Sequence, residues 1–246
     1  MPVDVAHFYL SDDASSAVKG STLEVTGSEA RHAITVGRLA AGERMRVGDG
    51  RGLIAHGVVS AVGGDRFELQ VESTHFDDEP SPQLWLAQAL AKGDRDELAI
   101  QAATELGIDG VIPWAASRSI VRWERTKATK HEQRWTSILR EASKQCVRSR
   151  IPALKPLAST AQLAALGDEY QILVLEPTAA EPLRSFAADG RDILLVVGPE
   201  GGIAPAELAR LADAGAVEVS LGSTILRTST AGPAAIAVLN SVLGRW

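Results

Sequence analysis

Beyond residue 83, short apolar runs alternate with helix-length segments, and this alternation constrains the fold more than any other feature of the chain. We expect strands at residues 84–90, 111–113, 171–175, 193–197 and 217–219. We expect helices at residues 95–106, 126–147, 204–214 and 230–243, the first capped by Asp94 and ended by Gly107. Strands that alternate with helices predict a parallel α/β sheet covered on both faces.

The first 73 residues follow a different pattern, with short β-branched runs separated by Gly and Asp. The expected strands are residues 3–9, 23–26, 44–47, 53–62 and 67–71, with one helix at 29–39 capped by Ser28. Several short strands with turn signals predict a small β-barrel. Residues 74–83 are acidic and contain Pro80 and Pro82, which indicates a linker. The predicted division is therefore a barrel (1–73), a linker (74–83) and an α/β domain (84–246).

Positive charge is concentrated in one segment, although the chain as a whole has a net charge of -6. Residues 118–155 contain eleven Lys or Arg and three Glu, a balance of +8, so the rest of the chain carries -14. Such a concentration favours contact with the phosphates of RNA or DNA, because each neutralised phosphate releases counterions. The alternative interpretation is a solvated helix face.

The single cysteine, Cys146, allows neither an internal disulfide nor a zinc cage, and we interpret it as a packing residue. Residues 1–10 lack the features of a secretory signal, and the apolar runs are too short to span a bilayer. These features predict a cytoplasmic protein that uses no metal site and does not enter the membrane.

Three loops at the ends of expected strands carry the strongest functional signal. They are residues 175–177, the Gly-Pro-Glu-Gly-Gly run at 198–202, and residues 221–228. Ligands of open α/β sheets bind beyond the carboxyl ends of the strands, and glycine lets the backbone approach a ligand closely. The dinucleotide and P-loop patterns are both absent, so the loops predict neither an NAD nor an ATP site. Any one of them alone is more simply a tight turn.

Together these loops resemble the signature of the knotted SPOUT methyltransferases, and more narrowly the RsmE family. The similarity extends to Lys92-Gly93-Asp94-Arg95, to Ala103-Thr104-Glu105-Leu106-Gly107 and to Gln145, Arg148 and Pro152 in the basic segment. The resemblance implies an α/β fold whose C-terminal SPOUT-type parallel sheet contains a trefoil knot, plus a small N-terminal PUA-like barrel. It also implies a cytoplasmic homodimer packed through the knot.

The activity implied by this resemblance is S-adenosylmethionine-dependent methylation of N3 of a uridine in 16S rRNA of the 30S subunit. The expected cofactor-binding residues are Leu175, Glu176, Gly198, Gly201, Gly202, Leu221, Gly222, Ile225, Leu226, Thr228, Thr230 and Ala231. Arg227 is the expected catalytic residue, because a planar guanidinium can stabilise the anion that forms when N3 loses its proton. Glu200 is the second catalytic candidate. The general base stays open among Glu176, Glu200, Glu105 and solvent.

The expected RNA-binding residues lie in the basic segment and in the N-terminal helix: Arg118, Arg122, Lys144 and Arg148, with His32 and Arg38. Trp114, Trp123 and Trp135 lie among basic residues, where they could stack on unpaired bases, but core packing is the favoured interpretation.

Three competing hypotheses remain at this stage. A non-catalytic RNA-binding or ribosome-assembly protein would share the basic segment but would not bind the cofactor. Another SPOUT RNA methyltransferase would share the cofactor loops and differ in its target. A metabolic α/β enzyme could use residues 198–202 for a phosphate, but it would gain nothing from the basic segment or the barrel.

Overall fold

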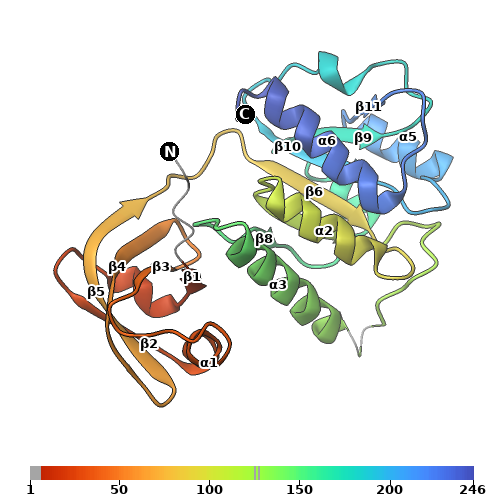
Figure 1. The fold of residues 1–246 in the computed structure, drawn as a ribbon. Helices are drawn as coiled ribbons and strands as arrows, with labels where there is room; N and C mark the ends of the chain where they lie inside the picture. The colour runs from red at the N-terminus through yellow and green to blue at the C-terminus, as the bar shows by residue number, and fades with distance from the viewer. Residues whose placement is uncertain (1–6, 125, 127) are drawn as a thin grey trace. The chain divides into compact units, whose positions relative to one another are not determined.

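The computed structural model describes residues 7–124, 126 and 128–246, and the chain divides into two units. The N-terminal unit joins Met1–Glu79 to a distant segment, Ser143–Ile151. The C-terminal unit comprises Pro80–Ala142 and Pro152–Trp246 (Figure 1). The 18-residue helix α3 (Ala128–Gln145) therefore begins in one unit and ends in the other.

The N-terminal unit is built on a five-stranded sheet with the order β1-β3-β4-β5-β2. Strand β1 pairs with β3 in parallel, and the other pairs are antiparallel. Alternate residues of β2 are buried, so Leu23 and Val25 join Phe67 and Leu69 in one apolar core. The elements are β1 (His7–Leu10), the 3-10 helix η1 (Asp12–Ser16), β2 (Thr22–Thr26), α1 (Gly27–Thr35), β3 (Arg44–Gly48), β4 (Leu53–Gly63) and β5 (Arg66–Phe76).

Helix α1 and strand β5 have boundaries that differ clearly from the sequence prediction. Helix α1 begins at Gly27, so Ser28 lies inside the helix and is not its cap. The helix ends early because the Val36 and Gly37 N–H groups both donate to the His32 carbonyl, and Arg38 then takes a left-handed φ of 53°. Strand β5 continues through residues 74–76, which the sequence assigned to the linker, because they pair with the first residues of β4.

The segment Ser143–Ile151 packs against the small sheet, which the sequence did not predict. Val147 and Ile151 contact the apolar cluster of Phe8, Leu10 and Ile54. Two backbone bonds hold the segment: Gly52 N–H donates to the Ser149 carbonyl at 3.1 Å, and Ile151 N–H donates to the Gly50 carbonyl at 3.0 Å. The basic end of α3 is thus part of the N-terminal unit.

The C-terminal unit contains the predicted parallel sheet, with the order β11-β9-β10-β6-β7-β8. Its strands are β6 (Leu84–Ala89), β7 (Gly110–Trp114), β8 (Ala153–Leu154), β9 (Tyr170–Leu175), β10 (Asp192–Val197) and β11 (Val217–Val219). Its other helices are α2 (Arg95–Glu105), α4 (Thr160–Ala164), η2 (Leu183–Ser185), α5 (Pro205–Asp213) and α6 (Thr228–Val242). The short elements β8, α4 and η2 were not predicted.

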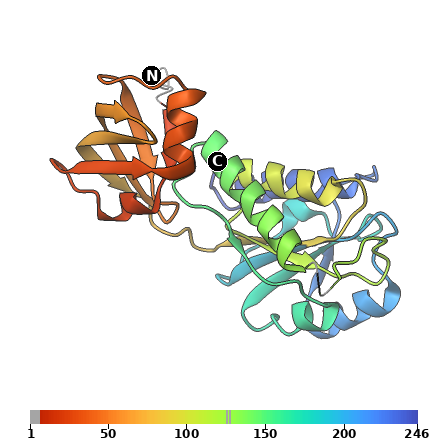
Figure 2. The ribbon, with the colours of Figure 1, turned by 90° about the horizontal axis from the view of Figure 1, so that it is seen from below.

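Helices cover both faces of this sheet, as a parallel sheet requires. Helices α2 and α6 lie side by side on one face, and α4 and α5 cover the other (Figure 2). Trp114, Trp123 and Trp135 are buried, which confirms the packing interpretation. The trefoil knot stays a prediction. Among the helices of the described residues, none is long and apolar enough to cross a membrane.

Candidate functional site

A cavity of about 390 Å³ opens at the carboxyl ends of β9, β10 and β11, within the size range of small-ligand pockets. All three predicted loops line it, together with the first turn of α6. The predicted residues in its lining are Leu175, Glu176, Gly198, Glu200, Gly202, Leu221, Gly222, Ile225, Leu226, Arg227, Thr228 and Ala231. The lining also includes Pro177, Pro199 and Thr224 from the same three loops, and Arg95, Val197, Ile203 and Val219; none of these seven was predicted as a site residue.

Two residues expected to bind the cofactor, Gly201 and Thr230, do not line this cavity. The Gly201 carbonyl accepts a hydrogen bond from Nη1 of Arg118 at 3.1 Å, and a Cβ at this position would lie 3.3 Å from the Arg118 Cβ. Thr230 is exposed in the first turn of α6. Neighbouring positions in a motif therefore face different surroundings.

Glycine is required at two points in the cavity wall. Gly222 has a φ of 131°, which side chains other than hydrogen rarely allow. A Cβ at Gly198 would lie 2.7 Å from Cγ1 of Ile203, so only glycine lets the end of β10 pass this side chain. These constraints explain why glycines stand at the ends of these strands.

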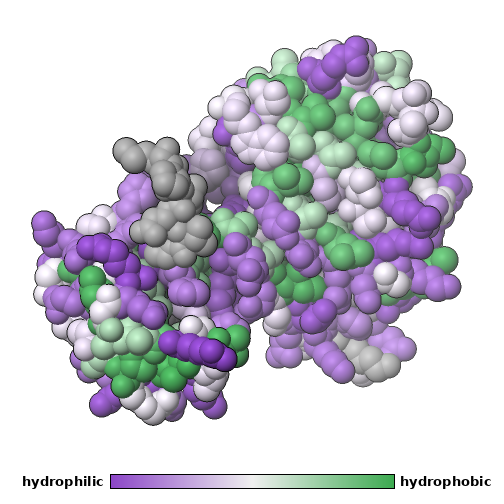
Figure 3. Space-filling model, in the orientation of Figure 1, coloured by the Kyte–Doolittle hydropathy of each residue, from purple (hydrophilic) through white to green (hydrophobic). Residues whose placement is uncertain are grey.

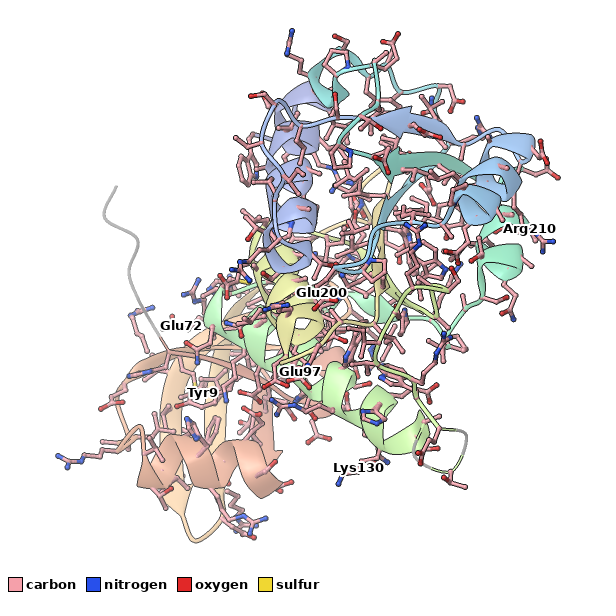
Figure 4. The ribbon with its side chains drawn as sticks, turned by 90° about the vertical axis from the view of Figure 1, so that its right-hand side faces the viewer. Tyr9, Glu72, Glu97, Lys130, Glu200 and Arg210 are labelled. Carbon is pink, nitrogen blue, oxygen red and sulfur yellow. The ribbon has the colours of Figure 1, made fainter. Side chains whose placement is uncertain are left out.

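Glu200 anchors its loop to α2. Its Oε1 accepts hydrogen bonds from the Lys92 N–H at 3.1 Å and from the Arg95 guanidinium at 2.8 Å. Figure 4 shows Glu200 beside the first turn of α2. Burial raises the pKa of Glu200, but hydrogen bonds from its own N–H, from Lys92 and from Arg95 outweigh burial and lower the pKa. An ionised, paired carboxylate is a weak base, so this geometry favours a structural role over the expected catalytic one.

Arg227 lines the cavity, and no carboxylate of the described residues neutralises its positive charge. It precedes the first residue of α6, lines the cavity and is exposed. Within the described residues its guanidinium has no hydrogen bond or ion pair. Arg95, the other arginine in the lining, is paired with Glu200. The five donors of the Arg227 guanidinium thus remain available to a ligand.

The other two carboxylates considered as general base, Glu176 and Glu105, differ in their position relative to the cavity. Glu176 lines the cavity, and its Oε1 accepts from the Thr178 hydroxyl at 3.1 Å. Glu105 lies at the end of α2, outside the lining, and accepts a hydrogen bond from Gln101. No group of three His, Cys, Asp or Glu suited to a metal ion is found among the described residues.

Sequence reasoning missed two buried polar residues of this unit, and one of them, Gln88, contacts a residue of the cavity wall. Gln88 of β6 is fully buried, and its amide donates to the Thr228 hydroxyl at 2.9 Å. Glu207, at the start of α5, accepts hydrogen bonds from the hydroxyls of Ser117 and Thr160. Burial raises the pKa of Glu207, but hydrogen bonds from Ser117, Thr160 and Ala204 outweigh it and lower the pKa. A polar residue in an otherwise apolar strand was the available signal for Gln88.

The predicted RNA-binding arginines of the C-terminal unit lie in the loop that precedes α3. Arg118 and Arg122 are both exposed. Each uses one guanidinium nitrogen inside the protein: Nη1 of Arg118 donates to the carbonyls of Gly201 at 3.1 Å and Ile203 at 3.5 Å, and Nη2 of Arg122 donates to the Ser117 carbonyl at 3.0 Å. The remaining donors of both guanidinium groups face solvent and can meet phosphate.

Lys144 is a correction to the predicted RNA-binding set. Its Nζ lies 2.9 Å from Oε2 of Glu29, and the two side chains are only 9% and 13% exposed. The ammonium also lies 5.0 Å from the centroid of the Tyr9 ring. Burial, and then the charges of Glu29 and Glu43, raise the pKa of Tyr9, which is labelled in Figure 4. The Lys144 ammonium is thus engaged in interior contacts of the N-terminal unit, so the structure does not present it to solvent as the sequence prediction requires.

The remaining predicted RNA-binding residues also belong to the N-terminal unit. Arg148 is half-buried in the segment that packs on the small sheet. His32 and Arg38 are exposed at and just beyond the end of α1. His32 contacts the edge of the Tyr9 ring, with the ring centroids 6.3 Å apart. His32 and Arg38 therefore remain the accessible candidates in this unit.

The sequence and the fold of this chain are similar to those of known proteins. The model of a family described as an RNA methyltransferase domain matches residues 78–240, and that of an RNA methyltransferase PUA domain matches residues 25–72. The ribosomal RNA small subunit methyltransferase E of Mycobacterium tuberculosis is 40% identical over 92% of this chain and 89% of its own length. The protein of the same name from Bacillus subtilis is 34% identical over 85% and 86%.

A solved structure shows the same likeness. It is a ribosomal RNA small subunit methyltransferase E from Neisseria gonorrhoeae bound to S-adenosyl methionine, and it aligns with a TM-score of 0.87. The sequences are 27% identical, and the alignment covers 96% of this chain and 98% of the other. The resemblance predicted from the loop motifs is thereby confirmed, and the chain belongs to the ribosomal RNA small subunit methyltransferase E family of RNA methyltransferases.

Proposed function

We propose that this protein transfers a methyl group from S-adenosylmethionine to N3 of a uridine in the 16S rRNA of the small ribosomal subunit. The observation that carries this proposal is the cavity at the strand ends, which combines the family's loops with one free arginine, Arg227. The relative from Neisseria gonorrhoeae, bound to S-adenosyl methionine, supports the choice of cofactor.

The residues of the cavity fit this cofactor. Its volume suits a ligand of nucleoside size, and its wall is mostly apolar side chains and backbone from glycine-containing loops. We propose that Gly198, Leu221, Gly222 and Leu226 hold the ligand largely through backbone groups. Gly201 and Thr230 are left out of this set, because they lie outside the cavity wall.

The cofactor supplies a methyl group activated by a positively charged sulfur, so the protein has to orient the acceptor and make it nucleophilic. Uridine N3 carries a proton, and its loss spreads negative charge over N3 and the two carbonyl oxygens. We propose that the guanidinium of Arg227 stabilises this anion. Solvent takes the proton in this scheme, because Glu200 is ionised and engaged with Arg95.

RNA contact is proposed for each unit separately. In the C-terminal unit the candidates are Arg118, Arg122 and Lys130, which projects from α3 in Figure 4. In the N-terminal unit they are His32 and Arg38. Each phosphate neutralised by such a group adds to the salt dependence of binding.

We also propose that the protein acts as a homodimer on the 30S subunit. Three large apolar side chains of the α2–α6 region are exposed: Leu98 at 56%, Val242 at 36% and Trp246 at 69%. Figure 3 shows apolar residues across this face of the C-terminal unit. Several large apolar side chains exposed on one face are typical of an interface between subunits. Light scattering of the purified chain tests this: a mass of about 26 kDa contradicts the dimer.

One assay tests the function directly. Labelled methyl groups from S-adenosylmethionine are offered to 30S subunits that lack the modification, and the product nucleoside is identified after digestion. We expect N3-methyluridine as the labelled product. A chain that binds 30S subunits without transferring label supports the non-catalytic alternative, and label on another nucleoside supports a different RNA methyltransferase.

A further inference from the structure

Gln88 occupies an unusual place for a glutamine. It lies in β6, where all six residues are buried, and its own exposed fraction is 0%. Its register partner on β10 is Val197, the residue before Gly198. Gln88 is therefore in the interior of the sheet, beside the last residue of β10. From there the chain continues into the cavity wall at Gly198.

The Gln88 amide begins a chain of hydrogen bonds that ends in the cavity wall. Its Nε2 donates to the Thr228 hydroxyl at 2.9 Å and to the Ala89 carbonyl at 3.1 Å. The Thr228 hydroxyl in turn donates to the Gly198 carbonyl at 2.8 Å. Three segments distant in the sequence, namely the end of β6, the end of β10 and the start of α6, are joined in this way.

The direction of this chain is fixed by chemistry. An amide NH₂ group can only donate, whereas a hydroxyl has one hydrogen to give and lone pairs to accept with. Because Gln88 donates to Thr228, the single hydroxyl hydrogen of Thr228 is directed at Gly198. Without that amide, the hydroxyl can rotate, and the link between the two cavity loops weakens.

The side-chain oxygen of Gln88 adds an energetic cost to the packing of the sheet. Its Oε1 is buried and has no hydrogen-bond partner among the described residues. An unpaired buried acceptor is costly, and a leucine of similar size would avoid that cost. The reason for an amide at this position must therefore lie in its donors, which act on Thr228.

We propose that Gln88 is a positioning residue, which sets the Thr228 hydroxyl so that the Gly198 loop and the start of α6 hold the ligand. This inference rests on the proposed function, because it takes the ligand of the cavity to be S-adenosylmethionine. Thr228 acts through the same link, and its hydroxyl hydrogen is not available to the ligand.

The test measures the affinity of the purified full chain for S-adenosylmethionine by calorimetry and its melting temperature without ligand. Gln88→Leu is expected to melt at the same or a higher temperature and to bind roughly fivefold to tenfold more weakly, the effect of one lost neutral hydrogen bond. Thr228→Val, which leaves the strand untouched, is expected to show the same loss, and Thr228→Ser should recover most of it. The double variant should be no weaker than either single one, because both break one link.

Gln171→Leu is the matched control. Gln171 stands at the start of β9, and its amide also donates to a carbonyl, that of Ala187, away from the cavity lining. The Gln171→Leu variant should bind S-adenosylmethionine with the affinity of the unmodified chain. Unchanged affinity in Gln88→Leu, or additive losses in the double variant, would overturn the positioning role. If the unmodified chain does not bind S-adenosylmethionine at all, the proposed function fails, and the inference fails with it.

Discussion

The loop that leads into α6 and the segment Ser143–Ile151 both carry cations that the sequence marks as functional, but they use them in opposite ways. In the loop, Arg227 is exposed and has no partner among the described residues. In the segment, Lys144 is buried against Glu29, and Arg150 donates to the Asp77 carbonyl at 2.8 Å. The comparison indicates that a positive charge is available to a ligand only where the fold leaves some of its hydrogen-bond donors without an internal partner.

The largest effect is expected on the methylation rate of variants of Arg227, the arginine without a partner among the described residues. Arg227→Ala should lower the single-turnover methylation rate by roughly tenfold to a thousandfold, the range for losing one preorganised donor. Arg227→Lys keeps the charge but loses the planar fork, so it should recover little of the rate. The rate is measured with saturating cofactor and RNA. Loss of cofactor affinity equal to the loss of rate would make Arg227 a binding residue instead.

For Lys144, whose ammonium is already paired inside the protein, substitution should change the stability of the protein. Lys144→Met removes the cation of a largely buried ion pair, so the desolvation cost of the Glu29 carboxylate is less well compensated, and the free energy of unfolding should fall by on the order of 3 kcal/mol. Denaturant titration measures this, and Lys130→Met, at an exposed lysine of the same helix, is the control. The RNA affinity of the folded Lys144→Met variant should not change. A weaker affinity with intact stability would return Lys144 to the RNA-binding set.

Between these extremes lie Arg118 and Arg122, which are exposed but each use one guanidinium nitrogen for hydrogen bonds to backbone carbonyls. Replacing either with Gln should reduce the slope of log affinity for RNA against log salt by about 0.7 to 0.9, the value for one phosphate contact. Filter binding over a series of salt concentrations gives the slope. Slopes that match the unmodified protein for both variants would show that this loop is only a solvated surface.

The smallest effect concerns the carboxylate of Glu207. Because its folded-state pKa is lowered, its contribution to stability is fully present above pH 4.5, the ordinary glutamate value, and is lost as pH falls through the lower, folded-state pKa. Glu207→Gln should therefore show a shallower loss of stability below pH 4.5 than the unmodified chain. Melting temperatures across this range test it, with the exposed Glu124→Gln as control. Parallel curves for Glu207→Gln and the unmodified chain would contradict the expected sign.

Local sequence patterns predicted the parallel sheet, because an apolar run buried on both faces needs no distant information to be recognised. They also placed most of the cavity, since the strand ends of such a sheet meet at one edge. They failed for α1, where the left-handed turn at Arg38 ends the helix earlier than the pattern suggests. They also failed for β8 and α4, which are too short to show a period.

The sequence by itself determined the class of fold, the three loops and the concentration of basic residues at 118–155, because each depends on neighbours along the chain. Only the tertiary structure decided which side chains are free. Gln88 and Thr228 are 140 residues apart in the chain, and Lys144 and Glu29 are 115 residues apart. Hydrogen-bond and ion-pair partners of this kind are chosen by packing, so the same residue type becomes a ligand contact in one place and an internal support in another.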